Sequence, residues 1–76
     1  MTLAIRLDDM AAIKKINDFA CKCDFDVYVH SSIHMMDAKS ILGLTSLVGR
    51  DDLRLVFPDH VRYERVEKAM KKSKLL

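Results

Sequence analysis

The first 22 residues change from a strand pattern to a helix pattern. In residues 2–7 (TLAIRL) large apolar side chains occupy every second position, which predicts a half-buried strand with three inward residues: Leu3, Ile5 and Leu7. From Met10 to about Lys22 the apolar residues recur at helical spacing. Asp8 or Asp9 suits the N-cap, because a carboxylate can accept hydrogen bonds from the first backbone N–H groups. The expected inward stripe is Met10, Ile13, Ile16 or Asn17, and Ala20.

A hairpin is expected after this helix. Residues 25–30 (FDVYVH) alternate again, with three apolar residues on one face: Phe25, Val27 and Val29. A polar turn at Ser31-Ser32 then leads to a brief strand over Ile33–Met36. Two adjacent strands joined by a tight turn favour antiparallel pairing, although no glycine is present to support a primed turn.

A short helix and a fourth strand follow. Lys39–Leu47 (KSILGLTSL) predicts about two helical turns with Ser40 as the N-cap, and Gly43 argues against a longer helix. After a loop over 48–52, Leu53–Phe57 (LRLVF) alternates and predicts a strand, which ends where Pro58 removes a backbone donor.

A last helix completes an α+β domain. It runs from about His60 to Lys72, with Asp59 as the expected cap and four inward residues: Tyr63, Val66, Ala69 and Met70. The order βαββαβα predicts an open-faced β-sandwich, in which helices cover one face of a four-stranded antiparallel sheet. A single domain over residues 1–76 is expected, too small for a large enclosed active site.

Charge and cysteine usage narrow the class of protein. The net charge of +2 does not indicate direct nucleic-acid binding, although the segment Arg62–Lys74 carries +4, from six basic and two acidic residues. That segment is either the dipole-matched end of a helix or a weak docking surface for anions. Cys21 and Cys23 are too close for an unstrained disulfide. With no transmembrane run and no signal peptide visible, a cytoplasmic protein without membrane contact is expected.

The residues that could carry chemistry do not form a known motif. Metal-ligand spacing is missing among the three histidines and two cysteines, so neither a metal nor a cofactor is expected: His30, His34, His60, Cys21 and Cys23. The acidic pairs Asp8-Asp9 and Asp51-Asp52 suit caps and solvation better than acid–base catalysis, which needs carboxylates in different environments. Enzymatic turnover is therefore not expected.

One segment resembles a known family. Lys39–Leu47 is similar to the Lys-Ser-Ile-Met-Gly-Val-Met-Ser-Leu segment of the HPr phosphocarriers of the bacterial phosphoenolpyruvate-dependent sugar phosphotransferase system. The hairpin Asp26–Met36 and the strand Leu53–Phe57 lie at about the family's spacing from it, and the element order matches the family's βαββαβα sandwich. The similarity covers roughly residues 2–72 and is strong over about 22–57.

The family's phosphoacceptor motif is missing from this chain. Where the family has Gly-(Ile/Leu)-His-(Ala/Thr)-Arg-Pro, this chain reads LDDMAA over residues 7–12, so Asp9 takes the histidine position and Ala11 the arginine position. The loop before the first helix is also about three residues shorter. A phosphohistidine carrier needs an imidazole nucleophile and a nearby cation, and the three histidines lie in other elements.

The resemblance carries four residues over to this chain. Ser40 matches the family's regulatory serine, and three residues match its partner-binding patch: Ile41, Leu42 and Thr45, the last in place of a methionine. In low-GC Gram-positive relatives an ATP-dependent kinase phosphorylates this serine, and the product is a corepressor for a catabolite-control transcription factor. The resemblance thus implies protein partners of the phosphotransferase or catabolite-regulation type.

The leading hypothesis is an HPr-like regulatory or protein-binding module, monomeric or weakly dimeric, that uses the Ser40 helix face and does not relay phosphoryl groups through histidine. Two alternatives remain open. The chain could be a working phosphotransferase component with a different phosphoacceptor, such as His60 or Asp9, or a small homodimerising structural domain.

Overall fold

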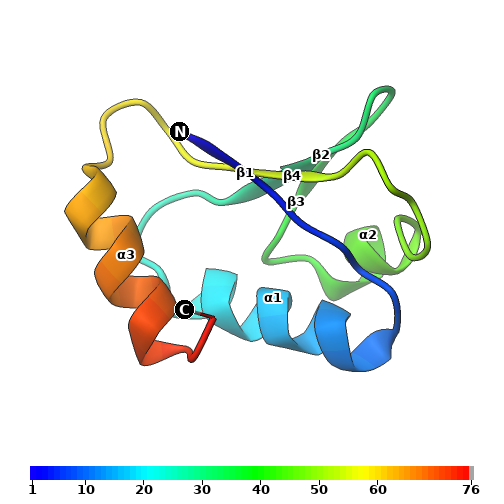
Figure 1. Cartoon of the computed structure of the whole chain (residues 1–76), viewed down its shortest axis with the longest axis horizontal. Helices are drawn as coiled ribbons and strands as arrows, with labels where there is room; N and C mark the ends of the chain where they lie inside the picture. The colour runs from blue at the N-terminus through cyan, green and yellow to red at the C-terminus, as the bar shows by residue number, and fades with distance from the viewer. Residues whose placement is uncertain (76) are drawn as a thin grey trace.

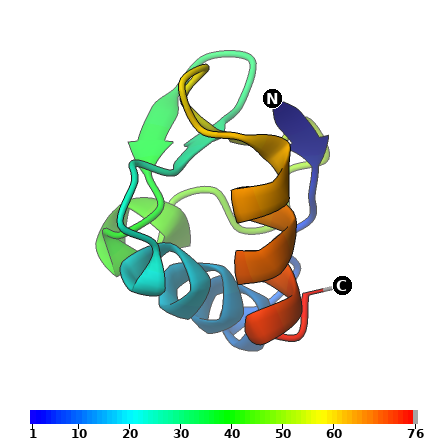
Figure 2. The same ribbon diagram turned by 90° about the vertical axis from the view of Figure 1, so that its left-hand side faces the viewer.

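Four short antiparallel strands form one layer and three helices form the other in the computed structural model, which describes residues 1–75 (Figures 1 and 2). The elements follow the order β1 (Thr2–Ala4), α1 (Met10–Lys22), β2 (Tyr28–His30), β3 (Met35–Asp37), α2 (Ile41–Thr45), β4 (Arg54–Val56) and α3 (Tyr63–Lys72). The strand order in the sheet is β1-β4-β2-β3. The predicted α+β class, the antiparallel four-stranded sheet and the element order are confirmed.

Register places every second strand residue on the helix side of the sheet. The central row pairs Leu3 with Leu55 and Leu55 with Val29, and Val29 in turn pairs with Met36. The rows on either side of it face away from the helices. All three helices lie on one side of the sheet, and the other face is open (Figure 1).

The core lies between the sheet and the helices. Phe57, directly after β4, packs edge-on against Phe19 of α1 and against Phe25, with ring centroids 6.2 Å apart in both pairs. The predicted inward residues of the first, second and fourth strand segments point to this core. Five of them are fully buried: Leu7, Val27, Val29, Leu55 and Phe57. Alternation of apolar residues therefore identified the buried face of the sheet correctly.

The strands are shorter than the sequence predicts. The pairing of β1 extends only to the bond from the Ile5 N–H to the Leu53 carbonyl (3.1 Å), after which the chain turns toward α1. β3 begins at Met35 because the hairpin turn takes four residues, Ser31–His34, and not two. The Ser31 hydroxyl stabilises this wider turn by accepting bonds from the Ile33 N–H (3.2 Å) and the His34 N–H (2.9 Å).

The ends of two helices also correct the sequence prediction. α3 begins at Tyr63, and its N-cap is Arg62, which makes no side-chain cap hydrogen bond, so the predicted cap at Asp59 is wrong. The segment before it closes a turn from the Val61 N–H to the Pro58 carbonyl (3.1 Å) and buries Val61, which delays the helix. Two expected inward residues, Tyr63 and Met10, are about half exposed, because each lies in the first turn of its helix, where the chain enters from the surface: 56% and 49%.

No helix within residues 1–75 has both the length and the apolar character needed to cross a membrane.

Candidate functional site

The start of α2 presents Ser40 to solvent. Ser40 is the N-cap, as predicted, with extended backbone (φ −101°, ψ 104°), and its hydroxyl oxygen accepts a bond from the Gly43 N–H at 3.3 Å. A serine hydroxyl suits this position because it satisfies one of the N–H groups that the first helical turn leaves unpaired. The residue is exposed, so its hydroxyl lies at the protein surface.

α2 carries a small apolar surface next to Ser40. Leu42 is 81% exposed and Ile41 lies partly open beside it, whereas Leu44, on the opposite side of the helix, is fully buried and anchors α2 to the core. Thr45 is half-buried, and its hydroxyl donates to the Leu42 carbonyl at 2.7 Å. The residues that we name the Ser40 face, Ser40, Ile41, Leu42 and Thr45, are therefore neighbours on one exposed helix.

Two exposed apolar residues that the sequence analysis did not single out for binding lie at the ends of neighbouring elements. Val48 follows α2 and is 45% exposed, and Met10 opens α1. The two ends are held together by the bond from the Gly49 N–H to the Leu7 carbonyl, at 2.9 Å. The sequence did not indicate that Met10 is exposed, because its position also fits the inward stripe of the helix.

The start of α1 holds Asp9 in a structural role. Asp9 is the N-cap of α1, and its carboxylate accepts a bond from the Ala12 N–H at 2.9 Å. A cation does lie close in the chain, but the Arg6 guanidinium is bound to the Asp8 carboxylate at 3.0 Å in an exposed ion pair. At the position of Ala11 there is a methyl group, which cannot hold an anion.

The three histidines lie away from this helix start. His30 is in β2, His34 is in the hairpin turn, and His60 lies between β4 and α3. His30 and His60 both line a cavity of about 410 Å³ on the open face of the sheet, together with Asp26 and Asp59. The sequence did not predict that His30 and His60 lie at one cavity, since their proximity depends on the pairing of β2 with β4.

That cavity is poorly suited to a phosphorylated histidine. Among residues 1–75 its lining contains two carboxylates and no lysine or arginine, so a phosphoryl group there would meet negative charge without a cation to offset it. The imidazole nitrogen Nε2 of His30 is buried and has no hydrogen-bond partner among residues 1–75. No group of three or more His, Cys, Asp or Glu side chains within those residues could hold a metal ion.

Both cysteines are free thiols, as their spacing predicts, and the structure places them in different environments. Cys21 is exposed, and Cys23 is buried with its Sγ donating to the Phe19 carbonyl at 3.3 Å. Burial raises the pKa of the Cys23 thiol, outweighing the opposite effect of the nearby cations Lys39 and Arg65. A protonated thiol is a poor nucleophile, so Cys23 is not suited to covalent catalysis.

Comparison of the chain with models of known protein families gave no match, and comparisons with characterised proteins and with solved structures gave none either.

Proposed function

We propose that this chain is an HPr-like protein-binding or regulatory module that acts through the Ser40 face and does not carry phosphoryl groups on histidine. The observation that carries the proposal is the contrast between two helix starts. Ser40 is exposed beside Leu42, a residue 81% open to solvent, while Asp9, at the position of the family's phosphohistidine, is occupied in capping α1. The βαββαβα order and the helix-covered sheet support the family assignment.

The Ser40 face has the chemistry of a small contact surface. Leu42 and Ile41 offer apolar area that a partner would remove from water, and their backbone is fixed because Leu44 is fully buried beneath them. A phosphate on Ser40 would add negative charge next to this area, which favours partners rich in arginine and disfavours partners that bury the patch. Phosphorylation of Ser40 would thus switch the Ser40 face from one class of partner to another.

The test of this proposal is phosphorylation of the purified chain. Incubation with a kinase of the family's type and labelled ATP should label the wild type and should not label Ser40→Ala. Ser46→Ala is the matched control, because Ser46 is an exposed serine at the other end of α2 whose hydroxyl donates to the Gly43 carbonyl at 2.7 Å. Equal labelling of wild type and Ser40→Ala would contradict the assignment.

The expected absence of phosphocarrier activity is tested in a separate experiment. Incubation with phosphoenolpyruvate and the family's general phosphotransferase enzyme should leave the chain without acid-labile phosphate, since there is no imidazole at the start of α1. Incorporation of phosphate, mapped to Asp9 or His60, would favour the alternative of a carrier with a different phosphoacceptor. Loss of that incorporation in Asp9→Asn or His60→Gln would identify which residue accepts it.

A homodimer is the remaining alternative, and the exposed edge of the sheet favours it. β3 is an edge strand, and its residue Met35 is 63% exposed, as is Ile33 (68%) in the turn before it. A second copy could cover these side chains. A strict monomer in sedimentation at two protein concentrations would exclude the structural domain, whereas a stable dimer that is lost in Met35→Lys would support it.

A further inference from the structure

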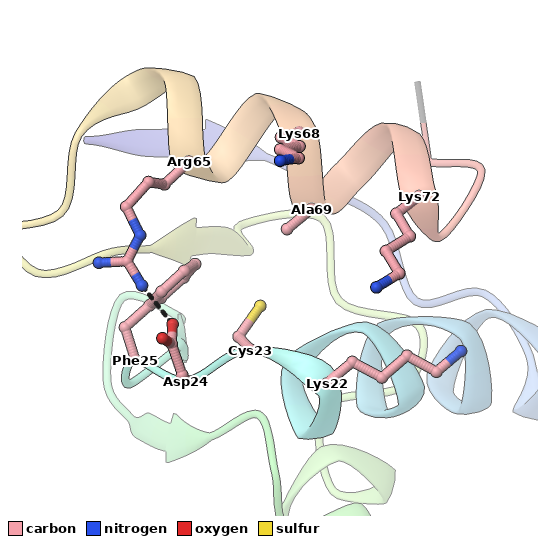
Figure 3. Close-up of a pocket in the computed structure, with 8 residues that line it drawn as sticks. All are labelled: Lys22, Cys23, Asp24, Phe25, Arg65, Lys68, Ala69 and Lys72. Atoms are coloured by element: carbon pink, nitrogen blue, oxygen red, sulfur yellow. Dashed lines mark hydrogen bonds and ion pairs between the residues drawn. The ribbon is translucent and has the colours of Figure 1, made fainter.

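A basic cleft lies between the end of α1 and α3, on neither of the surfaces described above. Its volume is about 480 Å³, and its cationic residues come from two helices far apart in sequence: Lys22, Arg65, Lys68 and Lys72 (Figure 3). The cleft includes no residue of α2, so it is distinct from the Ser40 face. We infer that this cleft, which we name the basic cleft, binds a small molecule carrying neighbouring phosphate groups.

The helix dipole accounts for only part of this charge. Lys22 and Lys72 lie in the last turns of α1 and α3, where cations are favoured by the negative end of the dipole. Arg65 lies in the first turn of α3 and Lys68 in its middle, where the dipole gives no such preference. The interaction of cations with the helix dipole therefore does not explain why all four side chains lie at one cleft.

The floor of the cleft is apolar and its rim is charged. Cys23 and Phe25 are both only 8% exposed, and the Cys23 sulfur points from the end of α1 toward Ala69 of α3 (Figure 3). The three lysines are exposed, and in the same view Lys72 extends from α3 toward α1. A floor of low polarity strengthens the attraction between rim cations and a bound anion, because less water screens them.

The rim has an excess of positive charge. Among residues 1–75 the only carboxylate in the lining is Asp24, which leaves four cations against one anion, a formal net of +3. Asp24 is bound to Arg65, and no ion pair joins Lys22, Lys68 or Lys72 to any other residue within 1–75. Three ammonium groups at one cleft repel one another unless an anion lies between them.

These contacts favour phosphate over other anions and over aromatic ligands. The planar guanidinium of Arg65, which would hold a carboxylate or a phosphate through two parallel bonds, is already engaged by Asp24 and lies 5.2 Å from the centre of the Phe25 ring. A ligand ring would compete with Arg65 for that ring face. The remaining cations are lysines, and a phosphate group, which carries more charge and more acceptor oxygens than a carboxylate, can meet several ammonium groups at once. Lys68 and Lys72 are one helical turn apart, so two neighbouring phosphate groups can be reached at once.

Inorganic pyrophosphate is the probe, and its binding is followed by backbone amide shifts in heteronuclear NMR at low ionic strength. We expect shifts centred on residues 22–25 and 65–72 and weaker binding as salt is added. Citrate, a polycarboxylate of similar charge, should bind more weakly. Equal affinity for citrate, or shifts spread over all basic surfaces, would overturn the proposal.

Charge-matched variants separate the cleft from general attraction. Lys68→Gln combined with Lys72→Gln should weaken pyrophosphate binding about tenfold, since two contacting charges are removed. Lys14→Gln combined with Lys71→Gln removes the same charge from exposed residues outside the cleft and should change binding less than about twofold. All four side chains are exposed, so both variants should fold. Equal loss in the two double variants would overturn the site.

The variant Asp24→Asn should increase the affinity of the basic cleft for pyrophosphate. The Asp24 side chain is 80% exposed, and replacing it releases Arg65 and raises the net charge of the cleft. Pyrophosphate should then bind about threefold more tightly, by an amount comparable to one exposed charge pair. Unchanged or weaker binding would show that Arg65 and the cleft lysines do not act on the same ligand.

Discussion

The Asp9 carboxylate accepts a hydrogen bond from the Ala12 backbone N–H at 2.9 Å and thereby caps α1. Asp9→Ala should lower the free energy of unfolding by about 1 kcal/mol, because this N–H loses its partner, while Asp9→Ser should recover most of the loss. Urea denaturation followed by circular dichroism measures both. If Asp9→Ala were as stable as the wild type, the carboxylate would not act as the cap and a different role for it would be open again.

The two glycines predict opposite effects of an added methyl group. Gly43 lies within α2, and a Cβ there would meet Met36 Sδ at 3.5 Å and Ser40 Oγ at 3.6 Å, which are ordinary contacts. Gly43→Ala should therefore stabilise the protein by about 0.5–1 kcal/mol, the helix preference for alanine. Gly49 has φ +83°, so Gly49→Ala should destabilise it by about 1 kcal/mol although the space is open. Thermal unfolding of both variants checks the signs.

Local hydrogen-bond chemistry made the two short-range caps predictable. Asp9 and Ser40 each satisfy an N–H three residues ahead, and the residue type and spacing suffice to recognise this. The buried faces of the strands followed from alternation, because successive side chains of a strand point to opposite faces of the sheet. Asp59 failed as a cap because a turn that buries Val61 moves the start of α3, and this depends on contacts beyond the segment.

Contacts between residues far apart in the sequence could not be predicted from the sequence pattern. Arg65 and Asp24 are 41 residues apart, so the charge run in α3 indicated a basic surface but not its position over the end of α1. The open-face cavity that brings His30 and His60 together likewise depends on strand order. The HPr resemblance stays a prediction, because comparison with known proteins gave no match and the fold alone does not fix a function.

Asp52 links two loops and makes stability depend on pH. Its carboxylate accepts bonds from the Arg50 guanidinium (2.8 and 2.7 Å) and from the Ser32 N–H and hydroxyl (2.9 and 2.7 Å). The bond from Arg50, followed by those from Ser32, holds the pKa of Asp52 well below its ordinary value. A lowered pKa gives stability that is present above the ordinary carboxyl pKa of about 3.9 and is lost as pH falls further.

The expected result is a difference in acid sensitivity between two neighbouring variants. The urea midpoint of the wild type should decrease as the pH is lowered from about 5 to about 2. Part of that decrease should be missing in Asp52→Asn, which starts from lower stability. Asp51→Asn is the control, because Asp51 is exposed and makes no side-chain hydrogen bond within residues 1–75. The same slope in Asp52→Asn and Asp51→Asn would contradict the role assigned to Asp52.

The two thiols should react at different rates although one residue separates them. Cys21 is exposed, whereas Cys23 is 8% exposed, donates to the Phe19 carbonyl and has a pKa raised by burial. Since the thiolate is the reactive form, iodoacetamide at about pH 8 should alkylate Cys23 at least about tenfold more slowly than Cys21. Mass spectrometry of Cys21→Ser and Cys23→Ser follows each thiol alone. In urea the two rates should become similar, because unfolding removes the burial, and a slow Cys23 that stayed slow in urea would mean that burial is not the cause.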